Sequence, residues 1–232
     1  MNQITLNLDR VSQEIAATAG SYGRDPNKVR LLAVSKRHPV AAIEAAHAWG
    51  QNDFGENYVA EAVEKIARLP DTLTWHFIGA IQGNKTRLIA EHFHWVHTID
   101  RMRIARRLSQ QRESDHDLNV LIQVDLGGGA QRAGIAPERA LDLARQVNEL
   151  PHLALRGLMV LPPPEAHLHA QRRHFAQVAE LAARGRTQGL PLGELSMGMS
   201  GDLEAAIAEG ATWVRIGTAV FGPRPQAQAA SR

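Results

Sequence analysis

Short apolar runs alternate with longer amphipathic segments along nearly the whole chain. The apolar runs are rich in Val, Ile, Leu and aromatic residues and have the length of buried strands. The expected strands are 29–35, 53–57, 75–80, 95–99, 119–125, 153–161, 192–197 and 213–217. The segments between them repeat apolar residues at the three- and four-residue spacing of an amphipathic helix, as in VAEAVEKIARL at 59–69.

This alternation predicts the fold class. Repeated strand–helix units form a parallel sheet covered by helices, and eight of them favour a closed (β/α)8 TIM barrel over an open doubly wound sheet. A single domain over 1–232 is expected, because no linker or low-complexity segment interrupts the pattern. An extra helix at about 6–23 precedes the first strand, and a frayed tail is expected at about 225–232. Pro137 is typical of a first helical turn and Gly185 of a helix end.

Composition narrows the function classes. The 26 Lys and Arg residues against 24 Asp and Glu give a net charge of +2, so nucleic-acid binding is not expected. No apolar stretch reaches membrane-spanning length, and MNQITLNLDR lacks the apolar core of a signal peptide. The absence of cysteine excludes disulfides and cysteine-based metal sites and fits a reducing compartment. We therefore expect a cytoplasmic protein that does not act on a membrane.

Polar residues directly after the strands are the candidates for chemistry, because these positions meet on one face of a parallel barrel. Lys36 follows the first strand, Ser200 follows the seventh, and Gly217 and Thr218 follow the eighth. Loops after the last two strands form the usual phosphate site of this architecture. A lysine opposite such a site favours an imine with a phosphorylated carbonyl compound, since desolvation or a neighbouring cation can lower the pKa of the amine.

Each candidate also has a purely structural explanation. Lys36 by itself fits a solvated strand end, and Ser200 fits a cap on a helix that starts near Gly201. The sequence HFHWVH at 92–97 offers three histidines, but their spacing matches no zinc pattern, so no metal site is expected.

A set of ordered sequence blocks is a more specific signal in this chain than any single motif. The blocks LLAVSK, FGENYVAE, WHFIGAIQGNK, GLMVLPP and LSMGMSGDLEAAIAEGATWVRIGTAVFG run along nearly its whole length. In these blocks the sequence resembles the pyridoxal 5′-phosphate homeostasis protein family (YggS/PROSC type). The resemblance implies a PLP fold type III barrel, like the N-terminal domain of alanine racemase but without the C-terminal β-domain.

The resemblance also implies the cofactor, pyridoxal 5′-phosphate (PLP), and the residues that hold it. These residues all lie in the matching blocks and are Lys36, Asn57, Met199, Ser200, Arg215, Gly217 and Thr218. Lys36 would carry PLP as a Schiff base, and Arg215 would face the pyridine nitrogen. Ser200, Gly217 and Thr218 would hold the phosphate, and the other two would contact the ring or pack beside it. No residue is implied as catalytic.

One block departs from the family. The polar SGE-x-SK-x-G that usually follows the fifth strand is LGGGAQRAG here, with Gly129 in place of the glutamate and Arg132 in place of the lysine. This departure removes the basis for assigning a secondary PLP contact or a transfer surface to that loop.

The expected function is a non-enzymatic role in vitamin B6 homeostasis, in which the protein buffers PLP or delivers it to apo-enzymes. An arginine at the pyridine nitrogen weakens the ring as an electron sink, although racemases of this fold work with that arrangement. Those racemases take a second acid/base from an added β-domain, whereas this sequence ends at Arg232, and neither Tyr22 nor Tyr58 suggests that role. The alternative is a PLP-dependent, racemase-like enzyme; a third reading is an adaptor acting through protein contacts. A monomer is expected, because the dimer partner surface of the racemases is missing.

Overall fold

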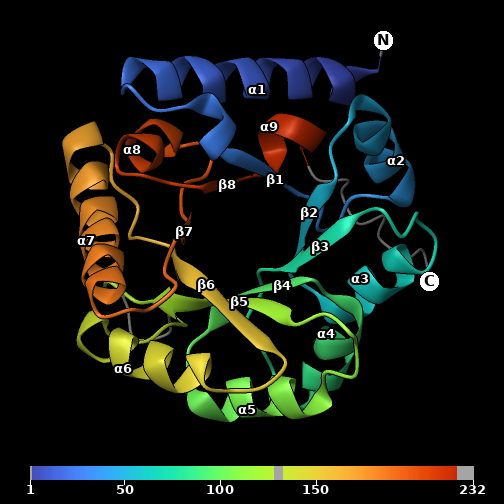
Figure 1. Ribbon diagram of the computed structural model, residues 1–232. Coiled ribbons are helices and arrows are strands. Elements are labelled where there is room, and N and C mark those ends of the chain that lie inside the picture. Colours follow the sequence, from blue (N-terminus) through green and yellow to red (C-terminus); the bar gives the residue numbers. More distant parts are fainter. Residues whose placement is uncertain (1, 128–132, 224–232) are drawn as a thin grey trace, which may run out of the picture.

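Eight parallel strands close into a barrel with helices around it, as the computed structural model shows for residues 2–127 and 133–223 (Figure 1). The strands are β1 Arg30–Val34, β2 Asp53–Glu56, β3 Thr74–Phe77, β4 Trp95–Ile99, β5 Leu118–Val124, β6 Leu153–Val160, β7 Glu194–Ser196 and β8 Trp213–Ile216. Each strand pairs with its sequence neighbours, and β8 returns to β1. The predicted closed (β/α)8 barrel with eight strands is therefore confirmed.

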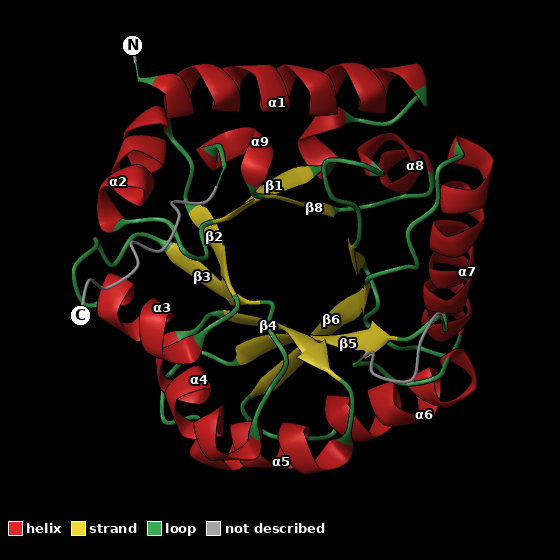
Figure 2. Ribbon diagram, turned by 180° about the vertical axis from the view of Figure 1, so that it is seen from behind, coloured by secondary structure: helices red, strands yellow, loops and turns green. Residues whose placement is uncertain are grey.

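Helices surround the barrel on its outer side (Figure 2). They are α1 Gln3–Ser21, α2 Val40–Trp49, α3 Val59–Ile66, α4 Thr86–His92, α5 Met102–Gln111, α6 Pro137–Asn148, α7 Leu168–Thr187, α8 Leu203–Ala208 and α9 Thr218–Phe221, with short 3-10 turns at Pro26–Lys28 and Gly83–Lys85. Their apolar faces and the outward faces of the strands form one continuous core. None of the helices in the described ranges is both long and apolar enough to cross a membrane.

The extra N-terminal helix begins earlier than its sequence pattern predicts. The side chain of Asn2 accepts a hydrogen bond from the amide of Ile4, so α1 starts at Gln3 rather than near 6 and ends at Ser21 rather than 23. It buries Leu8 and Val11 and lies beside α2, α8 and α9 (Figure 1).

Two helix-boundary predictions have different outcomes. Pro137 is the first residue of α6, as predicted. Gly185 lies inside the last turn of α7 rather than after it, so that prediction is wrong. A Cβ at this position would lie 2.3 Å from Cδ1 of Leu192, so a glycine allows close packing here instead of ending the helix. The tail expected at about 225–232, Gly129 and Arg132 lie outside the described residues.

The barrel interior is more polar than near-continuous apolar strands would suggest. Because β4 and β7 are not neighbours, the 2.8 Å hydrogen bond between Nδ1 of His97 and Oγ of Ser196 must cross the interior. His76 and Arg215 are buried beside these residues. The inward faces of the strands therefore connect polar groups from opposite sides of the barrel.

Candidate functional site

One pocket of about 300 Å³ lies at the C-terminal ends of the strands. All seven residues that the sequence singles out line it, together with Val34, Ile78, Met159, Leu161 and Gly201. The seven predicted residues come from the ends of four strands, β1, β2, β7 and β8, which are brought together only by closure of the barrel. The structure thus gathers the whole predicted set, while the roles of its members stay predictions.

Lys36 stands in the wall of this pocket, just beyond β1. The amide of Ser35 still donates to the carbonyl of Gly55 on β2, which holds the chain in line with the strand up to the lysine. Arg37 then adopts a positive φ of 64°, and the amide of His38 donates back to the carbonyl of Ser35. The chain therefore turns sharply after Lys36 and leaves its half-buried side chain at the pocket.

A buried charge cluster fixes the backbone on both sides of Lys36. Nζ of Lys65 donates to the carbonyl oxygen of Ser35 (2.9 Å) and to carboxylate oxygens of Glu56 (2.7 Å) and Glu61 (2.6 Å). The same Glu61 oxygen accepts the amide of Arg37. Because both chain neighbours of Lys36 are bound by this cluster, its Cα position is set by α3 as well as by β1.

The cluster depends on balanced charges. Burial raises the pKa of Glu56, and the adjacent Lys65 ammonium acts against this shift. Oε1 of Glu56 accepts from both Lys65 and the hydroxyl of Ser35, whereas Oε2 has no hydrogen-bond partner among the described residues. Loss of the ammonium would leave a buried carboxylate with only the hydroxyl to stabilise it.

Arg215 places a buried cation at the base of the pocket. Its Nη1 donates to Oγ of Ser196 and its Nη2 to the carbonyl oxygen of Val160, both at 2.9 Å. Burial lowers the pKa of Arg215 to about 10, and Asp202 partly opposes that change. The guanidinium therefore remains charged at neutral pH, and these two bonds leave three of its five N–H donors for other acceptors.

The loops after β7 and β8 build another part of the pocket. Ser200, Gly201, Gly217 and Thr218 line it, so two hydroxyl groups and glycine backbone lie together. Asp202, not Ser200, is the residue before α8, so the helix-cap explanation for Ser200 is wrong. Ser200 is exposed and lines the pocket.

Gly198 shapes that loop by close packing. Its φ is 95°, and a Cβ there would lie 2.5 Å from Cβ of Ala206 on α8. Asp202 completes the turn by accepting the amide of Met199. The loop therefore reaches the pocket in one defined path, with Met199 exposed at its rim.

Asn57 contributes a side-chain amide to the pocket. Its Oδ1 is buried and has no hydrogen-bond partner among the described residues. Since buried acceptors are almost always paired, this oxygen indicates that a donor from a ligand or a water completes the site.

Sequence reasoning missed Lys65 and the polar interior of the barrel. The available signal for Lys65 is its place on the buried face of α3, in line with Val59 and Ala62. For His76 and His97 no local pattern was available, because their partners lie on other strands.

The three histidines at 92–97 do not come together. Nδ1 of His94 accepts the amide of Trp75, and His97 points into the barrel toward Ser196. Within 2–127 and 133–223, no group of three or more His, Cys, Asp or Glu side chains is arranged to hold a metal ion.

Comparisons with known proteins cover almost the entire chain. The model of the family "Alanine racemase, N-terminal domain" matches residues 6–225. The chain is 54% identical to the pyridoxal phosphate homeostasis protein of Pseudomonas aeruginosa over 233 residues, covering all of both chains. It is 49% identical to the protein of that name from Escherichia coli K12, covering 97% of this chain and 98% of the other.

Solved structures agree with this similarity. The structure of PipY from Synechococcus elongatus with PLP bound is 41% identical, has a TM-score of 0.81, and covers 95% of this chain and 100% of that one. Alanine racemase from Corynebacterium glutamicum is 19% identical with a TM-score of 0.68, and the match covers 97% of this chain and 61% of the racemase. The racemase match shows a common fold and nothing more.

Proposed function

The chain belongs to the pyridoxal phosphate homeostasis protein family, which carries the alanine racemase N-terminal domain, and from this premise we propose that it binds PLP and buffers or delivers it. The observation that carries the proposal is the pocket, which gathers an amine, a buried guanidinium and two hydroxyl groups. The PLP-bound structure of PipY, 41% identical to this chain, supports it.

The residues of the pocket fit the chemical groups of PLP. The Lys36 amine matches the aldehyde, and the buried Arg215 guanidinium matches an unprotonated ring nitrogen that can accept a hydrogen bond. Ser200 and Thr218 match the phosphate, and the unpaired Oδ1 of Asn57 matches a donor on the ligand or a bound water. A volume of about 300 Å³ is at the lower end for a small-molecule site.

Each residue then has one task. Lys36 would hold the ligand covalently by condensing its amine with the aldehyde, whose oxygen leaves as water, while Ser200, Gly217 and Thr218 would hold the phosphate by hydrogen bonds. Arg215 would donate to the ring nitrogen, and Met199 at the rim would pack beside the ligand. PLP itself supplies an electrophilic aldehyde and a ring that can accept electron density, which Arg215 limits by keeping the nitrogen unprotonated.

The proposed role is binding rather than turnover. Among the described residues that line the pocket, Lys36 and Arg215 are the ones with titratable side chains, and Arg215 stays protonated. The hydroxyl of Tyr58 accepts a hydrogen bond from Arg37, and Tyr58 as a residue is 45% exposed. A second acid/base for reversing the configuration of an amino acid is thus missing from the described pocket. PLP-requiring apo-enzymes in the cytoplasm are the recipients we propose.

The test combines absorption spectroscopy with chemical trapping. Purified protein mixed with PLP is expected to show the absorption of a lysine-bound cofactor, and borohydride reduction followed by peptide mass analysis is expected to place the adduct on Lys36. The same preparation with L-alanine should yield no D-alanine. An adduct on another residue would overturn the site, and sustained formation of D-alanine would favour the racemase-like alternative.

Thr218→Val tests the phosphate end. Valine keeps the shape of threonine but removes the hydroxyl, and a hydrogen bond to a charged group contributes about 1.5–3 kcal/mol, so PLP affinity should fall by roughly tenfold or more. Affinity measured by spectral titration for pyridoxal, which has no phosphate, should be unchanged. An equal loss for both ligands would contradict the assignment of Thr218 to the phosphate.

A further inference from the structure

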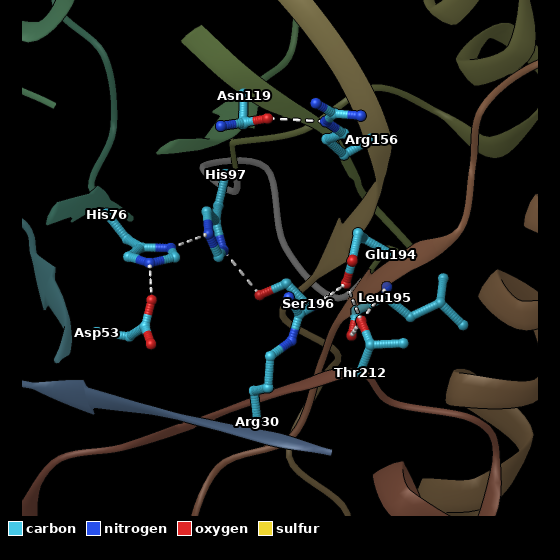
Figure 3. A network of polar contacts seen from close by, with 10 residues as sticks. All are labelled: Arg30, Asp53, His76, His97, Asn119, Arg156, Glu194, Leu195, Ser196 and Thr212. Carbon is cyan, nitrogen blue, oxygen red and sulfur yellow. Dashed lines mark hydrogen bonds and ion pairs between the residues drawn. The ribbon is translucent and has the colours of Figure 1, made fainter. Parts of the chain in front are cut away.

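A row of hydrogen-bonded side chains crosses the barrel interior (Figure 3). Oδ1 of Asp53 lies 3.0 Å from Nε2 of His76, and Nδ1 of His76 lies 3.0 Å from Nε2 of His97. Nδ1 of His97 lies 2.8 Å from Oγ of Ser196, which accepts Nη1 of Arg215 at 2.9 Å. The row thus runs from β2 through β3, β4 and β7 to the buried cation of the pocket on β8.

The protonation of the two histidines follows from their burial. His76 and His97 are fully buried, and burial lowers the pKa of both, that of His97 well below its usual 6.5. Asp53 opposes the shift at His76 without reversing it. Each imidazole therefore carries one proton at neutral pH and has one donor and one acceptor nitrogen.

The Asp53 carboxylate determines the direction of every bond in the row. A carboxylate only accepts, so Nε2 of His76 carries the proton and Nδ1 of His76 is an acceptor. Nε2 of His97 must then donate to it, which leaves Nδ1 of His97 to accept the Ser196 hydroxyl proton. Ser196 consequently turns its lone pairs toward Arg215.

We propose that Asp53, His76, His97 and Ser196 are positioning residues that orient the Arg215 guanidinium toward the ring nitrogen of the ligand. This inference rests on the proposed function and deepens it. The row presents an acceptor to Nη1 of Arg215, and the carbonyl oxygen of Val160 presents another to Nη2. Two acceptors fix the plane of the guanidinium, so that its other N–H donors face the pocket.

The row connects the two ends of the barrel. Asp53 is the first residue of β2 and its side chain is 31% exposed, whereas Arg215 near the end of β8 is 4% exposed and lines the pocket. A change at Asp53 can therefore reach the pocket through the row without altering a residue that touches the ligand.

The same region of the barrel offers a matched control. Nε of Arg156 donates to Oδ1 of Asn119 at 2.7 Å, and no hydrogen bond of the structure joins this pair to the row in the described chain (Figure 3). Asn119 lies on β5 near its start, as Asp53 lies at the start of β2. Asn119→Ala thus removes an exposed polar pair near the start of a strand but leaves the row intact.

The first measurement requires no ligand. Two-bond ¹H–¹⁵N spectra of histidine-labelled protein at neutral pH should show His76 and His97 with the proton on Nε2, with assignments from His76→Gln and His97→Gln. Asp53→Asn keeps the shape but introduces an amide that can donate to His76, as well as accept from it. Its His97 signal should then shift toward protonation at Nδ1, while Asn119→Ala should leave it unchanged.

The second measurement is PLP affinity by spectral titration. We expect Asp53→Asn to lower the affinity roughly three- to tenfold and Asn119→Ala to leave it within about twofold. Ser196→Ala, which removes the acceptor of Arg215 directly, should have at least the effect of Asp53→Asn.

The outcomes separate the two proposals. If the wild-type protein binds no PLP, the proposed function fails while the proton positions can still be read. If it binds PLP but His97 carries its proton on Nδ1, or if Asp53→Asn binds PLP as the wild type does, the positioning role of the row is refuted.

Discussion

Lys36→Ala is expected to abolish the covalent PLP adduct. The chain has four lysines, Lys28, Lys36, Lys65 and Lys85, and the guanidinium groups of its arginines stay protonated and cannot take the place of the amine. Lys28 precedes β1 at the opposite end of the barrel, and the Lys65 ammonium is bound by two carboxylates and a carbonyl. Borohydride trapping with peptide mass analysis should therefore find no modified lysine in the variant.

Lys85 supplies the matched control. It lines a neighbouring cavity together with Asn57, which also lines the main pocket, so it is the lysine from which a substitute amine could come. Lys85→Ala should retain the adduct and its absorption, and Lys36→Ala should lose both while keeping weak, non-covalent PLP binding. An adduct on Lys85 in the Lys36→Ala variant would contradict the prediction.

The alternation of apolar and amphipathic segments was enough to predict the barrel. The ends of individual strands could not be predicted in the same way, because they involve contacts between residues that are distant in sequence. The strand expected at 75–80 ends at Phe77, and just beyond it the chain passes close to the residue that follows β2: a Cβ at Gly79 would lie 2.2 Å from the carbonyl oxygen of Asn57. No pattern within one segment reveals an approach of that kind.

The members of the candidate site could also be predicted from the pattern of strands. In a parallel barrel, a residue directly after a strand lies on the same face as the others in that position, so Lys36, Ser200 and Thr218 could be placed together from sequence. The groups behind them could not, because a strand pattern does not tell which buried residue faces the interior. His97 and Ser196 meet only because β4 and β7 face each other across the closed barrel.

Lys65→Met is expected to destabilise the protein strongly at neutral pH. The Lys65 side chain is 6% exposed and that of its partner Glu56 is 0% exposed, and removal of one member of a buried ion pair typically costs about 3–5 kcal/mol. Methionine preserves most of the volume, so the loss reports the missing ammonium rather than a cavity. Denaturant unfolding should show this decrease, whereas Lys28→Met on the exposed turn before β1 should change stability by less than about 0.5 kcal/mol.

The pH dependence identifies Glu56 as the cause. Burial already raises the pKa of Glu56 above its usual value of 4.5, and loss of Lys65 removes the main opposing charge, so the carboxyl of the folded variant takes up a proton more readily than that of the unfolded chain. A folded state that binds more protons loses stability as pH rises, so the deficit of Lys65→Met should grow above pH 4.5 and shrink below it. Glu56→Gln combined with Lys65→Met should recover much of the loss at neutral pH, because the amide carries no charge to bury. A deficit that is independent of pH, or a double variant no more stable than Lys65→Met, would show that Lys65 acts through packing and not through Glu56.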